Sequence, residues 1–232
     1  MQQKTKALKA AFTHTIPVMA GYLFLGMAFG ILMNSKGYHF GWSVFMSIFI
    51  YAGSMQFAAI NLLTALFNPI NAFIITIMVN ARHLFYGLSM LGKFRGTGKK
   101  KAYLIFGLTD ETFSIVCSAE PPGGVSKGWF MFFVTLLDQI YWVVGSALGG
   151  ILGSIVSFNT KGIDFVMTAL FVVIFVSQWQ SQKNHIPAMI GVAASVLCLI
   201  LFGPNSFIIP SMLVIILVFT LFKKQIKGEI AE

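Results

Sequence analysis

The stretch Val79-Asn80-Ala81-Arg82-His83-Leu84-Phe85-Tyr86 lies inside an apolar run over residues 69–91. That run has about the length that a helix needs to cross a bilayer, and Arg82 falls near its middle. A charged side chain at the bilayer centre costs roughly 2.5–3.5 kcal/mol on insertion scales, so an ionisable residue at this depth indicates a functional site. The alternative is that Arg82 extends its guanidinium to the next interface. That is less favoured, because the next basic residues lie about three helical turns further on.

Asn80 and His83 are expected on one face of this helix, because side chains three or four residues apart are neighbours on a helix. Arg82 points to a different face, since it is one residue from His83 and two from Asn80. The helix therefore offers polar groups in two directions, which suits a helix buried among others rather than one facing lipid.

The composition is that of a helical membrane protein. Of the 232 residues, 57% are hydrophobic and 10% are charged, against about 25% charged residues in a typical soluble domain, and the mean hydropathy is +0.82. The apolar runs are long and continuous, whereas a transmembrane barrel has short alternating segments. We therefore expect an all-α, polytopic membrane protein, a single integral membrane domain over residues 1–232.

The net charge of +9 comes from basic residues gathered in short loops and tails. They lie in the N-terminal tail, in the loop over residues 93–101 and in the C-terminal tail. Such clusters orient a membrane protein with its basic segments in the cytoplasm, and they contact anionic lipid head groups. The positive charge is therefore no indication of a nucleic-acid partner, and the lipid bilayer is the expected partner instead.

Eight apolar runs follow one another, over residues 16–33, 42–67, 69–91, 102–119, 129–156, 163–177, 186–202 and 207–222. They predict seven or eight crossings with both termini in the cytoplasm. Three simple crossings from a cytoplasmic N-terminus would place the basic 93–101 loop outside, against the positive-inside rule. Either one of the first three runs does not cross or the loop is an exception. The second run is the natural suspect, as a re-entrant hairpin.

The second run is about 26 residues long and carries Tyr51-Ala52-Gly53-Ser54-Met55-Gln56 at its centre. Two interpretations compete. In one, Gly53 and Ser54 are packing residues and Gln56 hydrogen-bonds a neighbouring helix. In the other, the helix breaks and its free N–H groups face a ligand, as in transporters whose half-helix N-termini point at an anionic group of the substrate. We predict a discontinuous helix near Gly53.

Three acids lie at bilayer depth. Asp110 and Glu111 stand in the middle of the fourth run, and Asp138 stands in the fifth. A carboxylate at this depth needs a partner, a proton or water. We expect Arg82 to pair with one of these acids, and Asp110 and Glu111 rank before Asp138 because they follow on the next run and belong to one motif. The alternative is that the fourth run is a poor span lying near the membrane surface.

Small residues at four-residue spacing occur in two runs, as Gly26-x-x-x-Gly30 and as Gly145, Gly149 and Gly153. Such spacing lets another helix backbone approach closely. It therefore predicts close helix packing at both places.

Five motifs occur in order along most of the chain. They are Pro17 with Gly21 and Gly26-x-x-x-Gly30, then Tyr51-Ala52-Gly53-Ser54-x-Gln56, Asn80-Ala81-Arg82-His83-x-x-Tyr86, Thr109-Asp110-Glu111-Thr112-Phe113, and Trp142-x-x-Gly145 with Gly149 and Gly153. This ordered set resembles the AzlC family, the large subunits of bacterial two-component branched-chain amino acid exporters linked to azaleucine resistance. Met55 departs from the family pattern, where a smaller residue is expected, and would narrow a cavity beside Gly53.

The resemblance implies secondary export across the bacterial plasma membrane, driven by the proton gradient without ATP hydrolysis. It implies a small AzlD-type membrane subunit as partner. The implied substrates are leucine, isoleucine, valine and methionine-like amino acids. The sequence has no Walker loop, H-E-x-x-H or G-x-S-x-G motif, and its four histidines show no metal-ligand spacing, so we expect neither an enzyme nor a cofactor or metal.

A zwitterionic substrate needs a cation or free N–H groups for its carboxylate, an acid or carbonyls for its ammonium and an apolar pocket. The predicted substrate-binding residues are Gly53, Ser54, Gln56, Asn80, Arg82 and His83. The predicted proton-coupling residues are Asp110, Glu111 and Asp138. Two other functions fit the composition: a channel or pore for a small solute, and a non-transporting membrane scaffold.

Overall fold

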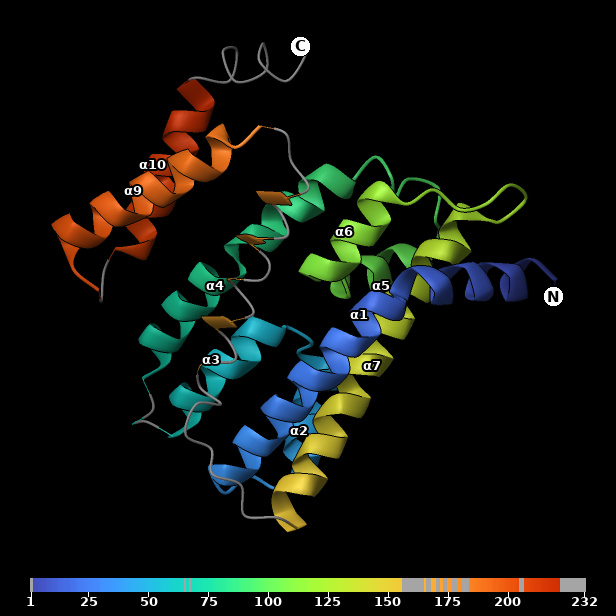
Figure 1. Cartoon of the computed structure of the whole chain (residues 1–232), viewed down its shortest axis with the longest axis horizontal. Helices are drawn as coiled ribbons and strands as arrows, with labels where there is room; N and C mark the ends of the chain where they lie inside the picture. Colours follow the sequence, from blue (N-terminus) through green and yellow to red (C-terminus); the bar gives the residue numbers. More distant parts are fainter. Residues whose placement is uncertain are drawn as a thin grey trace. The chain divides into compact units, whose positions relative to one another are not determined.

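The computed structural model describes residues 2–64, 66, 68–155, 165, 168–169, 172, 175–176, 179–180, 184–204 and 207–221. These residues form helices and connecting segments, with no strand among them (Figure 1). The prediction of an all-α protein is confirmed. The chain divides into two compact units, Met1–Met167 and Thr168–Glu232. Most of the expected sixth run, over residues 163–177, lies outside the described residues.

The described helices follow the apolar runs closely at most boundaries. In the first unit they are α1 (Gln2–Ser35), α2 (Phe40–Phe49), α3 (Gly53–Thr64), α4 (Pro69–Met90), α5 (Lys100–Phe106), α6 (Asp110–Ser118) and α7 (Lys127–Ile155). The second unit holds α9 (Ile186–Phe202) and α10 (Ile208–Leu221). Among the described residues, α1 and α7 are long and apolar enough to cross a bilayer.

Helices α1 and α7 run side by side with their backbones in contact (Figure 1). A Cβ atom at Gly26 would lie 2.9 Å from the Ser146 nitrogen, and a Cβ at Gly30 would overlap the Ser146 carbonyl oxygen. On the facing side, a Cβ at Gly149 would overlap the backbone of Met27. The predicted close packing of both glycine motifs is therefore confirmed.

The second apolar run is interrupted and folds back on itself. Helix α2 ends at Phe49 and α3 begins at Gly53, and Tyr51 between them has a φ of +45°. The Tyr38 hydroxyl, before α2, donates to the carbonyl oxygen of Leu63 near the end of α3, at 3.1 Å. Helices α2 and α3 therefore form a hairpin whose tip is residues 50–52. The predicted interruption near Gly53 is confirmed.

The fourth apolar run is also interrupted, which the sequence reading did not foresee. Helix α5 ends at Phe106 and α6 begins at Asp110. The Lys93 ammonium, in the basic loop before α5, donates to the carbonyl oxygens of Val116 and Cys117 at the end of α6. Helices α5 and α6 therefore form a second hairpin, which starts and ends beside the basic loop.

A helix N-terminus explains the second interruption. Thr109 caps α6, because its hydroxyl accepts a hydrogen bond from the Thr112 N–H at 3.3 Å. Asp110 and Glu111 then occupy the first turn, where the helix dipole favours negative charge. A continuous helix over residues 102–119 would place both acids in its middle without that stabilisation.

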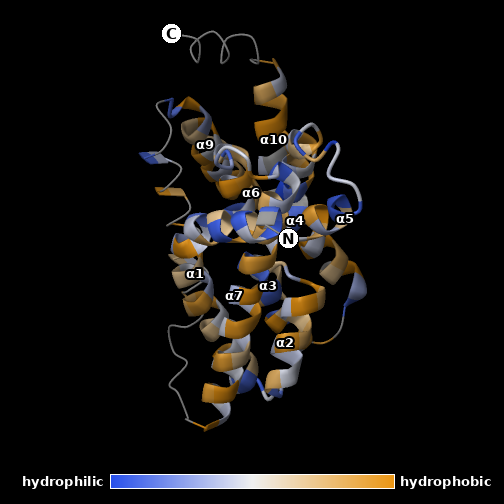
Figure 2. Cartoon of the chain, turned by 90° about the vertical axis from the view of Figure 1, so that its right-hand side faces the viewer, coloured by the Kyte–Doolittle hydropathy of each residue, from blue (hydrophilic) through white to orange (hydrophobic). Residues whose placement is uncertain are grey.

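The two hairpins start from opposite ends of α7. The ammonium groups of Lys4 and Lys100 lie 4.5 and 4.4 Å from the centre of the Trp129 ring. At the other end of α7, a Cβ at Gly150 would lie 2.7 Å from the Phe40 side chain, at the start of α2. We call these the Trp129 end and the Phe40 end. In the view of Figure 2, α2 lies low, and α5 and α6 lie high.

This arrangement brings the N-terminal tail and the basic loop to the same end of α7. Because the α2–α3 hairpin returns to the Phe40 end, only α1 and α4 run the full distance between the N-terminal tail and the 93–101 loop. Lys4 and Lys100 consequently meet on the same ring, that of Trp129. The predicted fold-back of the second run is confirmed, and its re-entrant position in a membrane stays a prediction.

Each hairpin packs into its own hydrophobic cluster. The α2–α3 hairpin packs around Phe29, Phe57 and Trp142. The α5–α6 hairpin packs around residues that include Phe94 and Phe130, from the basic loop and α7. All five side chains are at most 5% exposed, so apolar burial holds both hairpins against α1 and α7.

In the second unit, α9 has the bounds of the expected seventh run, and α10 lies within the eighth. Pro187 stands in the first turn of α9, where a missing N–H costs little. Ala194 and Cys198 are buried, whereas Ile200 and Leu201 are largely exposed. Apolar exposure of this kind is ordinary for a helix that faces lipid.

Candidate functional site

The tips of the two hairpins meet beside the middle of α7. The rings of Tyr51 and Phe106, one from each tip, have centroids 6.3 Å apart. A Cβ at Gly107 would lie 3.7 Å from the Tyr51 ring, and a Cβ at Gly53 would lie 3.2 Å from the Trp142 ring of α7. The N-terminus of α3 and the N-terminus of α6 therefore both lie at this place, which we call the junction.

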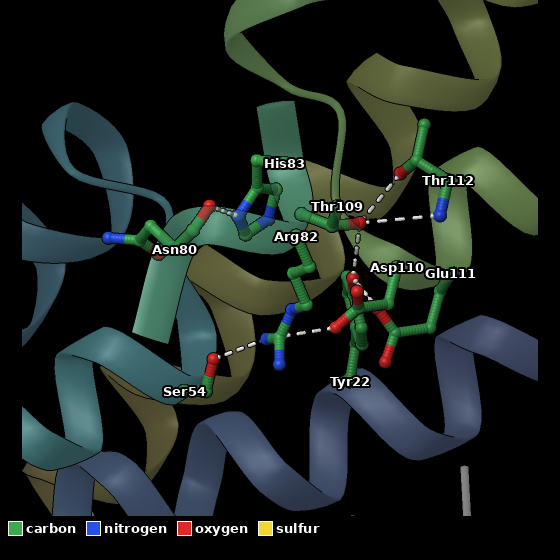
Figure 3. Close-up of polar contacts among 9 residues, drawn as sticks. All are labelled: Tyr22, Ser54, Asn80, Arg82, His83, Thr109, Asp110, Glu111 and Thr112. Atoms are coloured by element: carbon green, nitrogen blue, oxygen red, sulfur yellow. Dashed lines mark hydrogen bonds and ion pairs between the residues drawn. The ribbon is translucent and has the colours of Figure 1, made fainter. Parts of the chain in front are cut away.

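Arg82 of α4 connects the two N-termini (Figure 3). Its Nη2 donates to the Ser54 Oγ at 2.5 Å and lies 3.0 Å from the Asp110 Oδ2. The side chains of Arg82 and Asp110 are 29% and 17% exposed, so the ion pair is partly shielded from solvent. The predicted pairing of Arg82 with an acid of the fourth run is confirmed. Its role in transport stays a prediction.

Asn80 and His83 extend from α4 away from the Arg82 guanidinium (Figure 3). The His83 Nδ1 lies 3.3 Å from the Asn80 carbonyl oxygen, and the His83 ring meets the edge of Tyr86 at 5.8 Å. The helix thus presents polar groups in two directions, as predicted. The structure does not bring Asn80 and His83 to the junction.

Gln56 joins the first hairpin to α7. Its side chain is 0% exposed, its Nε2 donates to Ser47 Oγ at 3.2 Å, and its Oε1 accepts from Trp142 Nε1 at 3.0 Å. Ser47 in turn donates to Ser146 Oγ at 2.8 Å. Both competing interpretations of this region therefore hold in part: the helix breaks, and Gln56 hydrogen-bonds a neighbouring helix.

The other two acids, Glu111 and Asp138, are joined by hydroxyl groups, and Glu111 lies beside Asp110 in Figure 3. The Tyr22 hydroxyl of α1 lies 2.6 Å from the Glu111 Oε2. The Thr112 hydroxyl lies 2.7 Å from the Asp138 Oδ2, on α7. Asp138 is 0% exposed, whereas Glu111 is partly exposed. The structure therefore gathers all three predicted acids within one polar region.

Sequence reasoning missed three functional candidates here, namely Tyr22, Thr109 and Thr112. The two threonines flank the acids at a spacing of three, which is the spacing of a capped first turn, so a signal was present. Tyr22 carried no signal, because its partners lie 87 and 89 residues away in the chain.

The two N-termini at the junction differ in charge. The first turn of α3, Gly-Ser-Met-Gln in sequence, contains no acid, whereas the first turn of α6 contains Asp110 and Glu111. Each helix N-terminus carries a partial positive charge. At the second tip, the carboxylates of Asp110 and Glu111 offset the partial positive charge of the α6 N-terminus. At the first tip, the Arg82 guanidinium adds to the partial positive charge of the α3 N-terminus. Within the described part of the chain, no group of three or more His, Cys, Asp or Glu side chains could hold a metal ion.

The sequence model of a family described as AzlC protein matches residues 17–156. That range covers both hairpins and every residue of the junction.

Several relatives align over most of the chain. A protein of Bacillus subtilis (strain 168), named branched-chain amino acid transport protein AzlC, is 58% identical over 226 residues, covering 97% of this chain and 89% of its own. An uncharacterised membrane protein of Helicobacter pylori (strain J99) is 44% identical, covering 98% of this chain and all of its own. Inner membrane protein YgaZ of Escherichia coli (strain K12) is 27% identical over 78% of each chain. No solved structure matches.

Proposed function

The chain belongs to the AzlC family, and on that premise we propose that it is a secondary exporter of branched-chain amino acids. The observation that carries the proposal is the junction, where Arg82 joins the N-termini of two interrupted helices. Interrupted helices with N-termini near the bilayer midplane are a recurring way to bind the carboxylate of a small substrate. The Bacillus subtilis relative is named a branched-chain amino acid transport protein.

The charges at the junction match those of a zwitterion. We propose that the substrate carboxylate binds Arg82, Ser54 and the N–H groups at the start of α3 beside Gly53. The substrate ammonium then binds Asp110. Binding exchanges the internal Arg82–Asp110 ion pair for two ion pairs with the substrate, so neither buried charge is left uncompensated. Gln56 supports this site by holding the first hairpin against α7.

An aromatic pair flanks the ion pair and suits an aliphatic side chain. The rings of Tyr86 and Phe113 are stacked with centroids 4.5 Å apart. Tyr86 follows Arg82 by four residues on α4, and Phe113 follows Asp110 by three on α6, so each ring lies one helical turn from its charged neighbour. We propose that this pair contacts the side chain of leucine, isoleucine or valine. We propose that Asn80 and His83 do not contact the substrate directly, although the His83 ring meets the Tyr86 ring.

We propose a multi-pass arrangement in the plasma membrane with the Trp129 end in the cytoplasm. Lys4 and Lys100 lie at that end, and basic segments favour the cytoplasmic side. Two of the eight apolar runs form hairpins that do not run the length of α7, so we propose six full crossings in place of seven or eight. An even number keeps both termini in the cytoplasm.

Counterflow of labelled leucine in proteoliposomes tests the function. We expect saturable counterflow that unlabelled isoleucine and valine compete for. Arg82→Ala should abolish it, whereas Arg95→Ala, a matched change in the exposed basic loop, should keep it. Absence of counterflow in the wild type contradicts the proposal. Flux that does not saturate indicates a channel instead, and normal counterflow in Arg82→Ala indicates a scaffold or a different site.

The family resemblance also implies a partner, and we propose that export requires a small AzlD-type membrane subunit. Leucine efflux from cells that express this chain alone or together with the subunit tests the requirement. We expect efflux to rise only in the presence of both. Equal efflux from both kinds of cell contradicts it.

A further inference from the structure

We propose that the hydroxyl groups of Tyr22, Thr109 and Thr112 conduct a proton between Glu111 and Asp138. The inference rests on the proposed function, because it describes how proton movement is connected to the substrate site. It assigns a role to three residues that bear no charge. It also gives Glu111 and Asp138 different tasks from that of Asp110, which pairs with Arg82.

The five side chains form one continuous series of hydrogen bonds through three helices. Glu111 Oε2 lies 2.6 Å from the Tyr22 hydroxyl, which lies 2.7 Å from Thr109 Oγ1. Thr109 Oγ1 lies 3.0 Å from Thr112 Oγ1, which lies 2.7 Å from Asp138 Oδ2. Every step is within hydrogen-bond distance for two oxygen atoms, so the series is continuous from one acid to the other.

Counting hydrogen atoms shows that the series holds one additional proton. Four oxygen–oxygen hydrogen bonds join the five side chains, and each needs one hydrogen between its two oxygens. The three hydroxyl groups supply one hydrogen apiece, and an ionised carboxylate supplies none. The fourth hydrogen must therefore come from a protonated carboxyl group, on Glu111 or on Asp138.

The position of that proton sets the direction of the whole series. With the proton on Glu111, the carboxyl group donates to Tyr22, Tyr22 to Thr109, Thr109 to Thr112, and Thr112 to Asp138. With the proton on Asp138, each of the four hydrogen bonds runs in the opposite direction, from Asp138 to Glu111. Passing from one state to the other breaks four O–H bonds and forms four, so each hydroxyl group is regenerated and one positive charge crosses the series.

The two ends of the series lie in different surroundings. Asp138 is 0% exposed, and its Oδ1 has no hydrogen-bond partner among the described residues. A buried carboxylate with a single donor is costly unless it carries a proton. Glu111 is partly exposed and stands in the first turn of α6, next to Asp110. Glu111 is therefore the end that exchanges protons with the site, and Asp138 is the enclosed end.

Neighbouring charges connect the series to the substrate site. The titratable and charged groups that face the two acids are Tyr22 of α1, Tyr51 at the first tip, Arg82 and Tyr86 of α4, Tyr103 of α5 and Asp110 of α6. Arg82 and Asp110 act on Glu111. A substrate that separates Arg82 from Asp110 therefore changes the potential at Glu111 and moves the shared proton.

The first test compares exchange with proton-driven transport in proteoliposomes that contain the full chain and its partner subunit. Counterflow needs no net proton movement, whereas accumulation driven by a pH gradient does. We expect the Thr112→Val variant to keep leucine counterflow and to lose pH-driven accumulation of leucine. The Thr112→Ser variant, which retains a hydroxyl group, should show both. The matched control is Thr135→Val, because within the described part of the chain the Thr135 hydroxyl donates to its own helix, at the Met131 carbonyl oxygen.

The outcomes separate the two proposals. If wild-type protein shows no counterflow, the proposed function fails. If counterflow is present and Thr112→Val accumulates leucine like the wild type, the proton path is overturned. The proton path is also overturned if Thr135→Val loses as much pH-driven accumulation as Thr112→Val. The effect would then come from the loss of any buried hydroxyl group and not from the series.

Infrared spectroscopy of the purified protein gives a second test that does not depend on the valine variant. A protonated carboxyl group has a C=O stretching band that carboxylates lack. We expect such a band in the wild type, shifted in D₂O, and expect Asp138→Asn or Glu111→Gln to change it. The proposal is overturned if the wild type shows no protonated-carboxyl band, or if that band is the same in the wild type and in both variants.

Discussion

The two hairpin tips are alike in shape and opposite in chemistry. Each brings a helix N-terminus to the junction, but α3 begins with Gly53 and Ser54, whereas α6 begins with Asp110 and Glu111. A helix N-terminus favours a nearby negative charge. The second tip supplies that charge from its own sequence, whereas the first turn of α3 contains no acid, which is why we propose that it binds the substrate carboxylate. One tip is therefore suited to a carboxylate, and the other to an ammonium group and a proton.

The tips also differ in how the chain turns. The first tip holds Tyr51 at a φ of +45°, a conformation that costs a bulky residue about 1–2 kcal/mol. Tyr51 is only 4% exposed, so burial of its ring offsets that cost. The second tip uses Gly107 and the Thr109 cap instead. A strained tip and a capped tip thus reach the same place from opposite ends of α7.

Removing Arg82 should have the largest effect, because its side chain joins the two tips. Arg82→Ala is expected to abolish leucine counterflow and to lower stability by about 1–3 kcal/mol, less than for a fully buried pair because both partners are partly exposed. The double variant Arg82→Ala/Asp110→Ala should unfold at a higher temperature than Arg82→Ala alone, since no uncompensated acid is left. Thermal unfolding in detergent measures this. A double variant less stable than the single one contradicts the pairing.

Adding a methyl group should affect the two tips unequally. A Cβ at Gly107 would overlap the Thr135 methyl group, whereas a Cβ at Gly53 would lie 3.2 Å from the edge of the Trp142 ring. Gly107→Ala should therefore cost about 1–3 kcal/mol and Gly53→Ala less than about 1 kcal/mol. Gly87→Ala is the control, because nothing lies within 4 Å of its Cβ position. Equal midpoints of thermal unfolding for Gly107→Ala and Gly87→Ala would show that the tips do not pack as described.

The pH dependence of export should depend on the second tip and not on the first. Glu111→Gln removes one end of the proton series and is expected to flatten the dependence of leucine efflux on external pH. Ser54→Ala leaves the acids in place and should keep the wild-type profile. Efflux measured across a range of external pH decides this. A wild-type profile in Glu111→Gln removes Glu111 from proton coupling.

The smallest effect is expected from Ser54 itself. Ser54→Ala removes the hydrogen bond from Arg82 and one contact to the substrate carboxylate. The loss of about 0.5–1.5 kcal/mol, typical for one hydrogen bond, corresponds to a rise in KM of roughly 2- to 13-fold. Initial rates of counterflow against leucine concentration measure it. An unchanged KM would place the carboxylate elsewhere.

The first tip could be predicted from the sequence and the second could not. Gly53, Ser54 and Gln56 are conspicuous at the centre of an over-long apolar run, and the basic 93–101 loop required one run to turn back. In the sequence, Asp110 and Glu111 stand out as costly charges within one helix, whereas in the structure they form the first turn of a new helix. The capping Thr109 before them was the signal of a helix start.

Long-range partners were predictable only where charge demanded them. Arg82 needed an acid at its own depth, and Asp110 was a leading candidate on the next run. Tyr22 joins Glu111 and Thr109 across helices whose packing is set by glycines of α1 and α7. No periodicity in the sequence encodes such a contact, because it depends on the register between two helices.

Cysteine labelling from one side of the membrane tests most directly whether the hairpins start from opposite ends. Single cysteines at Lys36 and Leu66 flank the first hairpin, and single cysteines at Arg95 and Glu120 flank the second, all at exposed positions. In a variant without the native cysteines, a membrane-impermeant thiol reagent should label positions 36 and 66 on intact cells. Positions 95 and 120 should react only after the membrane is opened. Labelling of 36 and 66 from opposite sides would show that the second run crosses the membrane and would contradict the account.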